Sequence, residues 1–147
     1  MQAMPPLSGV RVLDLGHYLA GPLAGMLLAD QGAEVIKIDP PGPLRFNHPV
    51  NRILGRGKLH LRLDLRRTEH AQDFESLVRN SDVLIENFSP GTLARLGYSP
   101  QRLQALNPGL VCIALPGFAA EDERLADTQA WEGIIAAATG QFTDIHP

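Results

Sequence analysis

The sequence predicts an α/β protein with an open, mostly parallel, Rossmann-like sheet flanked by helices, and residues 1–147 would form one domain. Short apolar runs alternate with longer helical patterns along the chain, as in proteins whose parallel strands are joined by helices. A chain of 147 residues with 44% hydrophobic and 20% charged residues can bury a single core. Neither an internal repeat nor a low-complexity tract interrupts this alternation.

The N-terminal part of the chain predicts one strand–helix–strand unit. Residues 10–15 read as an apolar strand. A glycine-containing loop over 16–21 leads to Pro22, which suits the first turn of a helix, and Gly32 would end that helix. Residues 34–38 form the second strand, which completes the unit.

The next stretch predicts a long loop, a strand and a helix. Residues 39–57 are so rich in proline and glycine that we expect a loop, and loops of this length are often functional. Residues 59–65 alternate with period two, which predicts a strand with one polar face. Thr68 is a suitable N-cap for a helix to about Asn80. The buried side of this helix would carry Phe74, Leu77 and Val78.

The remaining elements follow in the same alternation. Residues 83–85 predict a fourth strand, and Ser99-Pro100 begins a short helix that Asn-Pro-Gly at 107–109 would close. Residues 110–115 predict a fifth strand, and 130–139 a final helix. Cys112 lies in the fifth strand, cannot form an internal disulfide, and is interpreted as a small core residue.

Charge and composition narrow the classes of partner. A net charge of -3 lacks the basic footprint of nucleic-acid binding. No apolar run approaches the roughly 20 residues that span a bilayer. The first residues show no basic segment followed by an apolar one, so no secretory signal is expected. We therefore expect a cytoplasmic protein with no nucleic-acid or membrane partner.

Common cofactor motifs are missing from the sequence. The histidines do not cluster with carboxylates or Cys112 at metal-ligand spacing, so no metal is expected. The Gly-Pro-Leu-Ala-Gly run at 21–25 lacks the Gly-x-Gly-x-x-Gly pattern, so NAD is not expected either. Leu59 follows Lys58 where a phosphate-binding Walker motif needs serine or threonine.

Three groups of short motifs stand out in chain order: residues 13–15, 19–22 and 28–38, then 55–58 and 63–65, then 81–91 with their continuation to Gly97. They include Leu-Asp-Leu, Leu-Ala-Gly-Pro, Gly-Arg-Gly-Lys, a second Leu-Asp-Leu and Ile-Glu-Asn-Phe-Ser-Pro-Gly. In this order and spacing they resemble the class III coenzyme A transferase family (CaiB/BaiF), which includes formyl-CoA transferase and α-methylacyl-CoA racemase. The resemblance fades over 115–129, where the family has Gly-Phe-Gly and this chain keeps only Gly117-Phe118.

The resemblance implies a cleft for coenzyme A at the carboxyl ends of the strands, where open α/β sheets bind ligands. The loop after the first strand would line the cleft, an asparagine and a phenylalanine would contact CoA, and three basic residues would face its phosphates. The implied CoA-binding residues are His17, Tyr18, Leu19, Ala20, Arg56, Lys58, Asn87, Phe88 and Arg95. Trp131 and Glu132 match positions near the acyl end.

Each candidate also has a structural interpretation that the residues alone leave open. The loop at 17–20 can be a packing loop, Asn87 a turn cap and Phe88 a core residue. The basic residues Arg56 and Lys58 can belong to a solvated loop. Glu132 can be a carboxylate that stabilises the start of a helix.

The family's reaction also sets an expectation about what this chain lacks. There, an aspartate attacks an acyl-CoA thioester, and an acyl-enzyme anhydride and an enzyme–CoA thioester follow. Residues 141–147 do not resemble the nucleophile segment, so no catalytic residue is assigned. The chain would be the CoA-binding N-terminal portion of a longer, two-domain enzyme that acts on an acyl-CoA and a carboxylate. The resemblance implies an interlocked homodimer for the complete enzyme. Alternatively, a separate partner chain would supply the half that this chain lacks.

Two alternative functions stay open at this stage. One is a relative of α-methylacyl-CoA racemase, which moves a proton at the α-carbon and has Gly-His-Asp where this chain has Ala130-Trp131-Glu132. The other is a non-catalytic module that binds CoA, a nucleotide-like ligand or a partner subunit. Binding of CoA by the isolated chain, and activity on adding a downstream polypeptide, would discriminate between them.

Overall fold

The computed structural model describes residues 4–44, 46–119 and 121–141, and these contain one five-stranded sheet. All four strand pairings are parallel, in the order β3-β2-β1-β4-β5. The strands are β1 (Arg11–Asp14), β2 (Glu34–Asp39), β3 (Lys58–Arg62), β4 (Val83–Glu86) and β5 (Val111–Ala114). The predicted α/β class and its Rossmann-like sheet are confirmed.

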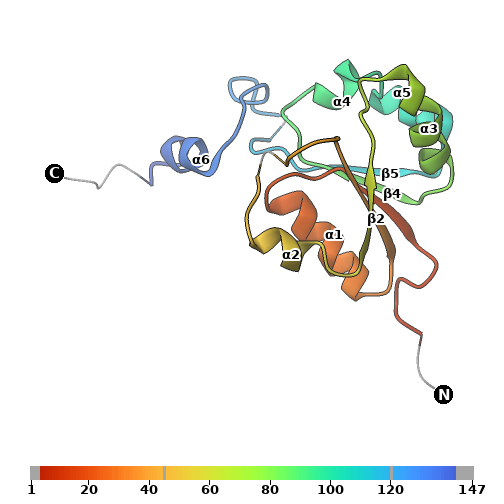
Figure 1. The fold of residues 1–147 in the computed structure, drawn as a ribbon. Helices are drawn as coiled ribbons and strands as arrows, with labels where there is room; N and C mark the ends of the chain where they lie inside the picture. Colours follow the sequence, from red (N-terminus) through yellow and green to blue (C-terminus); the bar gives the residue numbers. More distant parts are fainter. Residues whose placement is uncertain (1–3, 45, 120, 142–147) are drawn as a thin grey trace.

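Helices cover the two faces of this sheet (Figure 1). One face carries α1 (Ala20–Asp30) and α2 (Val50–Leu54). The other face carries α3 (Ala71–Arg79), the short α4 (Thr92–Arg95) and α5 (Pro100–Leu106). The last helix, α6 (Glu132–Ala138), stands away from the sheet at the end of a connecting segment.

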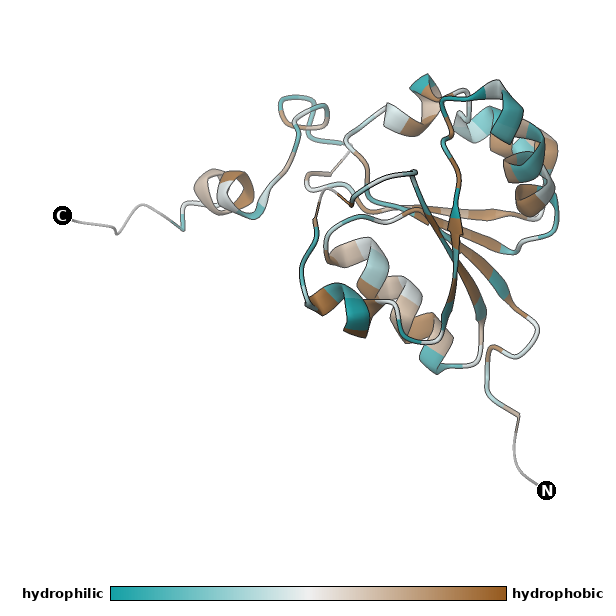
Figure 2. Cartoon of the chain, in the orientation of Figure 1, coloured by the Kyte–Doolittle hydropathy of each residue, from teal (hydrophilic) through white to brown (hydrophobic). Residues whose placement is uncertain are grey.

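The alternation of side chains along β1 creates two cores, one on each face of the sheet. Leu13 and Leu15 belong to a cluster with Phe74 of α3 and Leu103 of α5. Val12 belongs to a second cluster on the α1 face. In Figure 2 the central strands are predominantly hydrophobic, and the helices on either side mix hydrophobic and hydrophilic residues. The fold is therefore stabilised by burial on both faces of a central strand.

Several local predictions are confirmed. Pro22 lies in the first turn of α1, although the helix begins two residues before it, at Ala20. The Ser99 side chain accepts a hydrogen bond from the Arg102 amide at 3.2 Å, and Pro100 begins α5 as expected. Phe74 and Val78 are completely buried on the inner side of α3.

Other local predictions are wrong. The 39–57 segment is not all loop, because five of its residues form α2, a helix too short to show periodicity in the sequence. The four-residue α4 escaped prediction for the same reason. Thr68 does not cap α3, because it begins a 3-10 turn, η1 (Thr68–His70), and the N-cap of the helix is His70.

The two edge strands differ from expectation in their burial. Cys112 is exposed and is not a core residue, because β5 is an edge strand whose four residues all remain exposed. On the opposite edge, β3 leaves the Leu59 side chain 58% exposed, whereas Leu63, just beyond the strand, is buried. Periodicity identifies a strand, but the layer above it decides whether its apolar residues are buried.

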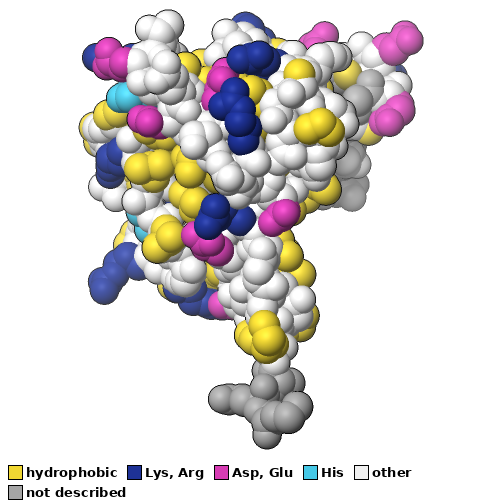
Figure 3. All heavy atoms as spheres, turned by 90° about the vertical axis from the view of Figure 1, so that its right-hand side faces the viewer, with side chains coloured by type: hydrophobic (Ala, Val, Ile, Leu, Met, Phe, Trp, Pro, Cys, Tyr) yellow, Lys and Arg dark blue, Asp and Glu magenta, His cyan; other side chains and the backbone are white. Residues whose placement is uncertain are grey.

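The outer surface is mixed in character. On the face that Figure 3 presents, basic and acidic side chains are intermingled, with hydrophobic side chains between them. Among the residues that the structure describes, no helix has both the length and the apolar character needed to cross a bilayer.

Candidate functional site

A cleft of about 1040 Å³ lies at the carboxyl ends of the strands. The strand order places β1 beside β4, where the chain changes direction across the sheet, and ligands of open α/β sheets bind at such points. The loops that follow β1 and β4 line the cleft together with segments after β2 and β3. Residues 114–117 and 128–132 complete the lining. The structure therefore has a cleft at the edge of the sheet where the site was predicted.

Asn87, at the end of β4, bridges the two central loops. Its Oδ1 accepts a hydrogen bond from the His17 amide at 2.6 Å, and its Nδ2 donates to the His17 carbonyl at 2.8 Å. Both ends of the side-chain amide thus hold the backbone of a residue 70 positions away. The structure assigns Asn87 a bridging role that neither sequence interpretation contained, and its contact with CoA stays a prediction.

Two glycines allow the chain to turn sharply after β1, and we call residues 16–22 the β1 turn. A Cβ atom placed on Gly16 would lie 2.6 Å from the Cα of Gly21, and the converse distance is also 2.6 Å. Either side chain would push the two ends of the turn apart. Within it, Tyr18 adopts a φ of +59°, a left-handed conformation that is unusual for a bulky residue.

Aromatic side chains from distant segments meet on the walls of the cleft. The His17 ring makes an edge contact with Phe88 at 5.2 Å between centroids. The Tyr18 ring makes an edge contact with Trp131 at 5.4 Å between centroids, and a tilted contact at 5.6 Å with Phe46, which is not part of the cleft lining. Edge-to-face pairs at such distances are favourable. Four of the residues predicted from the sequence are thus brought together in space.

The other predicted lining residues lie at the same cleft. Leu19 and Ala20 line it from the start of α1, and both are exposed. Glu132 lines it as the first residue of α6, which fits either a ligand contact or the helix-start interpretation. Phe88 also packs against the core cluster of the α3 face, so its structural and ligand-facing interpretations coexist.

None of the three predicted basic residues, Arg56, Lys58 and Arg95, lines the cleft. Arg56 forms an ion pair with Asp30, the last residue of α1. Because α1 runs antiparallel to the strands, its last residue lies at their amino ends, opposite the cleft. The hydrogen bond from Arg56 lowers the pKa of Asp30. Arg95 is exposed beside the cleft and donates to the Pro90 carbonyl at 3.2 Å and the Thr92 hydroxyl at 2.8 Å.

Lys58 is the first residue of β3, so its predicted position in a loop is wrong. Its side chain is completely buried and donates to Asp14 Oδ2 at 2.6 Å and to the Pro22 carbonyl at 2.7 Å. Burial lowers the pKa of Lys58, whereas the Asp14 carboxylate opposes that effect. The ammonium group lies inside the protein rather than on a surface open to a diphosphate. Its influence on CoA stays a prediction.

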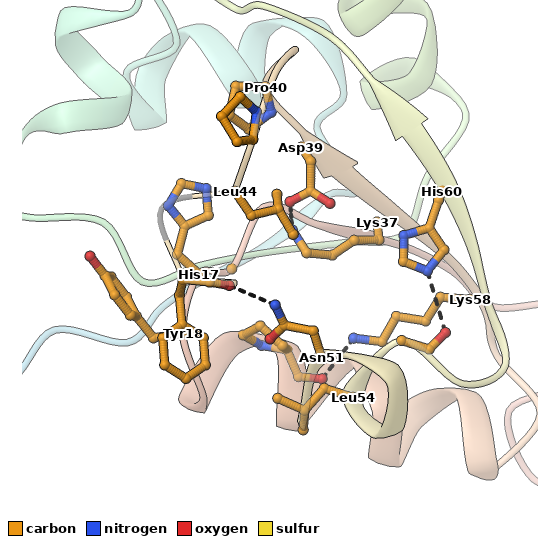
Figure 4. A pocket seen from close by; sticks show the side chains of 15 residues that line it. His17, Tyr18, Lys37, Asp39, Pro40, Leu44, Asn51, Leu54, Lys58 and His60 are labelled. Atoms are coloured by element: carbon orange, nitrogen blue, oxygen red, sulfur yellow. Dashed lines mark hydrogen bonds and ion pairs between the residues drawn. The ribbon is translucent and has the colours of Figure 1, made fainter. Parts of the chain in front are cut away.

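A smaller cavity of about 110 Å³ lies beyond His17 and Tyr18, which also line the cleft (Figure 4). Lys37 and Asp39 meet on one side of it as an ion pair of 2.9 Å, and Asn51 and Leu54 of α2 lie opposite. The predicted functional loop therefore supplies walls to both spaces, and part of that wall is the helix α2.

Arg66 is a candidate that the sequence analysis missed. It alone among the described lysines and arginines lines the cleft. Its Nε and Nη2 donate to the two carboxylate oxygens of Asp64 at 2.8 and 3.0 Å, and these hydrogen bonds lower the pKa of Asp64 to about 2. A signal was present: the arginine follows a predicted strand directly, at the carboxyl edge where ligands bind.

The titratable groups of the described residues do not gather into a cluster of three or more His, Cys, Asp or Glu side chains suited to a metal ion. The arrangement instead offers aromatic surfaces, hydrogen-bonding backbone and an exposed guanidinium. Such a site fits an extended organic ligand with rings and anionic groups.

Comparison with known proteins connects this geometry to a family. The sequence model of CoA-transferase family III matches residues 7–144. The CoA-transferase/lyase DddD of Marinomonas sp. (strain MWYL1) is 45% identical over 140 residues, which cover 95% of this chain and 17% of that protein. Succinyl-CoA–D-citramalate CoA-transferase of Chloroflexus aurantiacus is 46% identical over 124 residues, covering 77% of this chain and 31% of the relative.

Solved structures show the same relationship. Rv3272 from Mycobacterium tuberculosis matches with a TM-score of 0.85 and 33% identity, over 97% of this chain and 42% of that one. A CaiB/BaiF family protein from Brucella suis matches with a TM-score of 0.81 and 31% identity, over 94% of this chain and 40% of that one. The chain thus spans less than half the length of each of these relatives.

Proposed function

This chain belongs to CoA-transferase family III, and we propose that residues 1–147 form the CoA-binding N-terminal domain of a class III acyl-CoA:carboxylate CoA transferase. The observation that carries the proposal is the cleft at the carboxyl ends of β1 and β4, whose aromatic walls and exposed guanidinium suit the parts of CoA. Acyl-CoA and a carboxylic acid would be the substrates of the complete enzyme.

The parts of CoA have complementary partners along the cleft. Phe88 and His17 offer apolar and aromatic surface for the adenine. Arg66 in the lining of the cleft and Arg95 at the outer border of the cleft would pair with phosphate oxygens. The pantetheine arm would follow the β1 turn toward Trp131 and Glu132 at the acyl end.

We propose that the covalent step is carried out by an aspartate outside residues 1–147 of the complete enzyme, which attacks the thioester. The two aspartates that line the cleft, Asp39 and Asp64, lie in Ile-Asp-Pro and Leu-Asp-Leu and lack the preceding glycine of the family's nucleophile segment. The racemase alternative would need a histidine beside the carboxylate, and this chain has Trp131 there, whose indole cannot act as a proton-transfer group. The transferase function is therefore the better supported of the two.

We also propose that this domain works together with further polypeptide. A relative from Chloroflexus aurantiacus, 40% identical over 129 residues, is named as the alpha subunit of succinyl-CoA–L-malate CoA-transferase. For the present protein, the remaining part of the site would come from a longer chain, its homodimer or a partner subunit.

Calorimetric titration of CoA into this chain tests the proposal. Saturable binding is expected, and Arg66→Ala or Arg95→Ala should each weaken it by about 1–3 kcal/mol, the range for a charged hydrogen bond. Dephospho-CoA measures the contribution of the 3′-phosphate. Arg79→Ala, on the outer side of α3, is the matched control and should leave affinity unchanged. A folded chain that does not bind CoA would contradict the proposal.

A further inference from the structure

The β1 turn is held at both ends by one buried side-chain pair. Asp14 Oδ1 accepts the Gly16 amide at 2.8 Å, at the beginning of the turn. Asp14 Oδ2 accepts from Lys58 Nζ at 2.6 Å, and the same ammonium donates to the Pro22 carbonyl at 2.7 Å, at the end of the turn. The two ends, Gly16 and Pro22, are thereby connected through a single ion pair.

The pair is shielded from solvent, although Lys58 also borders the smaller cavity. Both side chains are 0% exposed, and a Cβ atom on Gly25 of α1 would lie 2.7 Å from Asp14 Oδ2 and 3.0 Å from Lys58 Nζ. α1 therefore approaches the pair closely because residue 25 lacks a side chain. A buried ion pair adds little net stability over apolar residues of the same volume, so stability alone does not account for its presence.

The turn that the pair holds carries the ligand-facing residues. His17 and Tyr18 lie between Gly16 and Pro22 and line both the cleft and the smaller cavity. Tyr18 is held in a left-handed conformation, which persists only where the surroundings over-determine it. Asn87 fixes the middle of the turn through His17, whereas Asp14 and Lys58 fix its two ends.

We propose that the Asp14–Lys58 pair is a positioning device for CoA binding: it holds the β1 turn in the conformation that presents His17 and Tyr18 to the ligand. This inference rests on the proposed function, because CoA is the ligand whose affinity it would control. Neither side chain lines the cleft. Both act through the backbone of Gly16 and Pro22, so they are positioning residues.

The test compares the double variant Asp14→Asn/Lys58→Met with the wild-type chain. Removing both charges avoids an unpaired buried ion, so the double variant is expected to fold. It keeps an acceptor for the Gly16 amide and loses the bond to the Pro22 carbonyl. CoA affinity should fall roughly tenfold, which equals about 1.4 kcal/mol. Hydrogen exchange at the Gly16, His17 and Leu23 amides should accelerate relative to the amides of β4.

A stability-matched control separates positioning from general destabilisation. Val78→Ala shortens a completely buried side chain in the core on the opposite face of the sheet. It should leave CoA affinity within about twofold of wild type, because distant sites act independently. A folded double variant with wild-type affinity and wild-type exchange in the β1 turn would overturn the inference. If the wild-type chain binds no CoA, the proposed function fails, and the exchange data still decide whether the pair holds the turn.

Discussion

The two faces of the sheet are built from different kinds of interaction. The face under α3 and α5 has an apolar core in which Phe74 and Tyr98 meet at 4.6 Å between ring centroids. The face under α1 contains two ion pairs in its interior, Lys58–Asp14 and Lys37–Asp39. Apolar packing tolerates small shifts, whereas hydrogen-bonded charges need defined geometry. The first face therefore supplies stability, and the second holds the ligand-facing turn.

Removing one partner of the buried pair should give the largest effect. Lys58→Met leaves the Asp14 carboxylate buried and unpaired, and we expect a loss of about 3–5 kcal/mol in the free energy of unfolding at neutral pH. Urea denaturation measures this. Adding Asp14→Asn should recover most of the loss, and a double variant as unstable as the single one would contradict the charge-based explanation.

A cavity on the apolar face should cost somewhat less and leave the site intact. Leu103→Ala removes a side chain that is 2% exposed, and we expect a loss of about 3 kcal/mol in the free energy of unfolding. CoA affinity, measured by calorimetry below the unfolding temperature, should not change. A large loss of affinity would mean that the two faces are not independent.

Removing the Asn87 bridge between the loops after β1 and β4 should have an intermediate effect on both stability and CoA affinity. Asn87→Ala removes two hydrogen bonds to His17, each worth about 0.5–1.5 kcal/mol in stability. Thermal unfolding measures the loss, and titration with CoA measures its consequence for the cleft. Asn80→Ala, which removes one exposed hydrogen bond to Ser76, is the control and should affect only stability.

The smallest expected effect is the change in stability with pH that comes from Asp64. Arg66 lowers the pKa of Asp64 to about 2, below its ordinary value in the unfolded chain. Any stabilisation from Asp64 is therefore complete above the unfolded pKa and is lost as pH falls from about 4 toward 2. Arg66→Gln should raise the Asp64 pKa, which NMR titration of its carboxyl carbon measures. Arg67→Gln should raise it less, because Arg67 Nε lies 3.9 Å from Asp64 Oδ2. Equal shifts in both variants would rule out the hydrogen bonds from Arg66 as the main cause.

Much of the candidate site could be predicted because its residues follow strands. His17 lies in the loop after the first strand and Asn87 comes directly after the fourth, and parallel strands bring their carboxyl ends to the same edge. Lys58 and Arg56 could not be placed in this way. Their motif leads into β3, so the backbone of both residues lies at the amino ends of the strands, opposite the cleft. Only the Lys58 side chain extends toward Asp14, whereas Arg56 pairs with Asp30.

Periodicity and turn residues report local conformation, so they were sufficient to predict the α/β class, the succession of strands and helices along the chain, and the loops that line the cleft. Only the tertiary structure decided that Cys112 is exposed, that Asn87 holds His17, and that Lys58 is buried against Asp14. These outcomes depend on contacts between segments that are far apart in the sequence: Asn87 and His17 are separated by 70 residues, and Lys58 and Asp14 by 44. Such long-range partners follow from strand order and layer packing, which no local pattern contains.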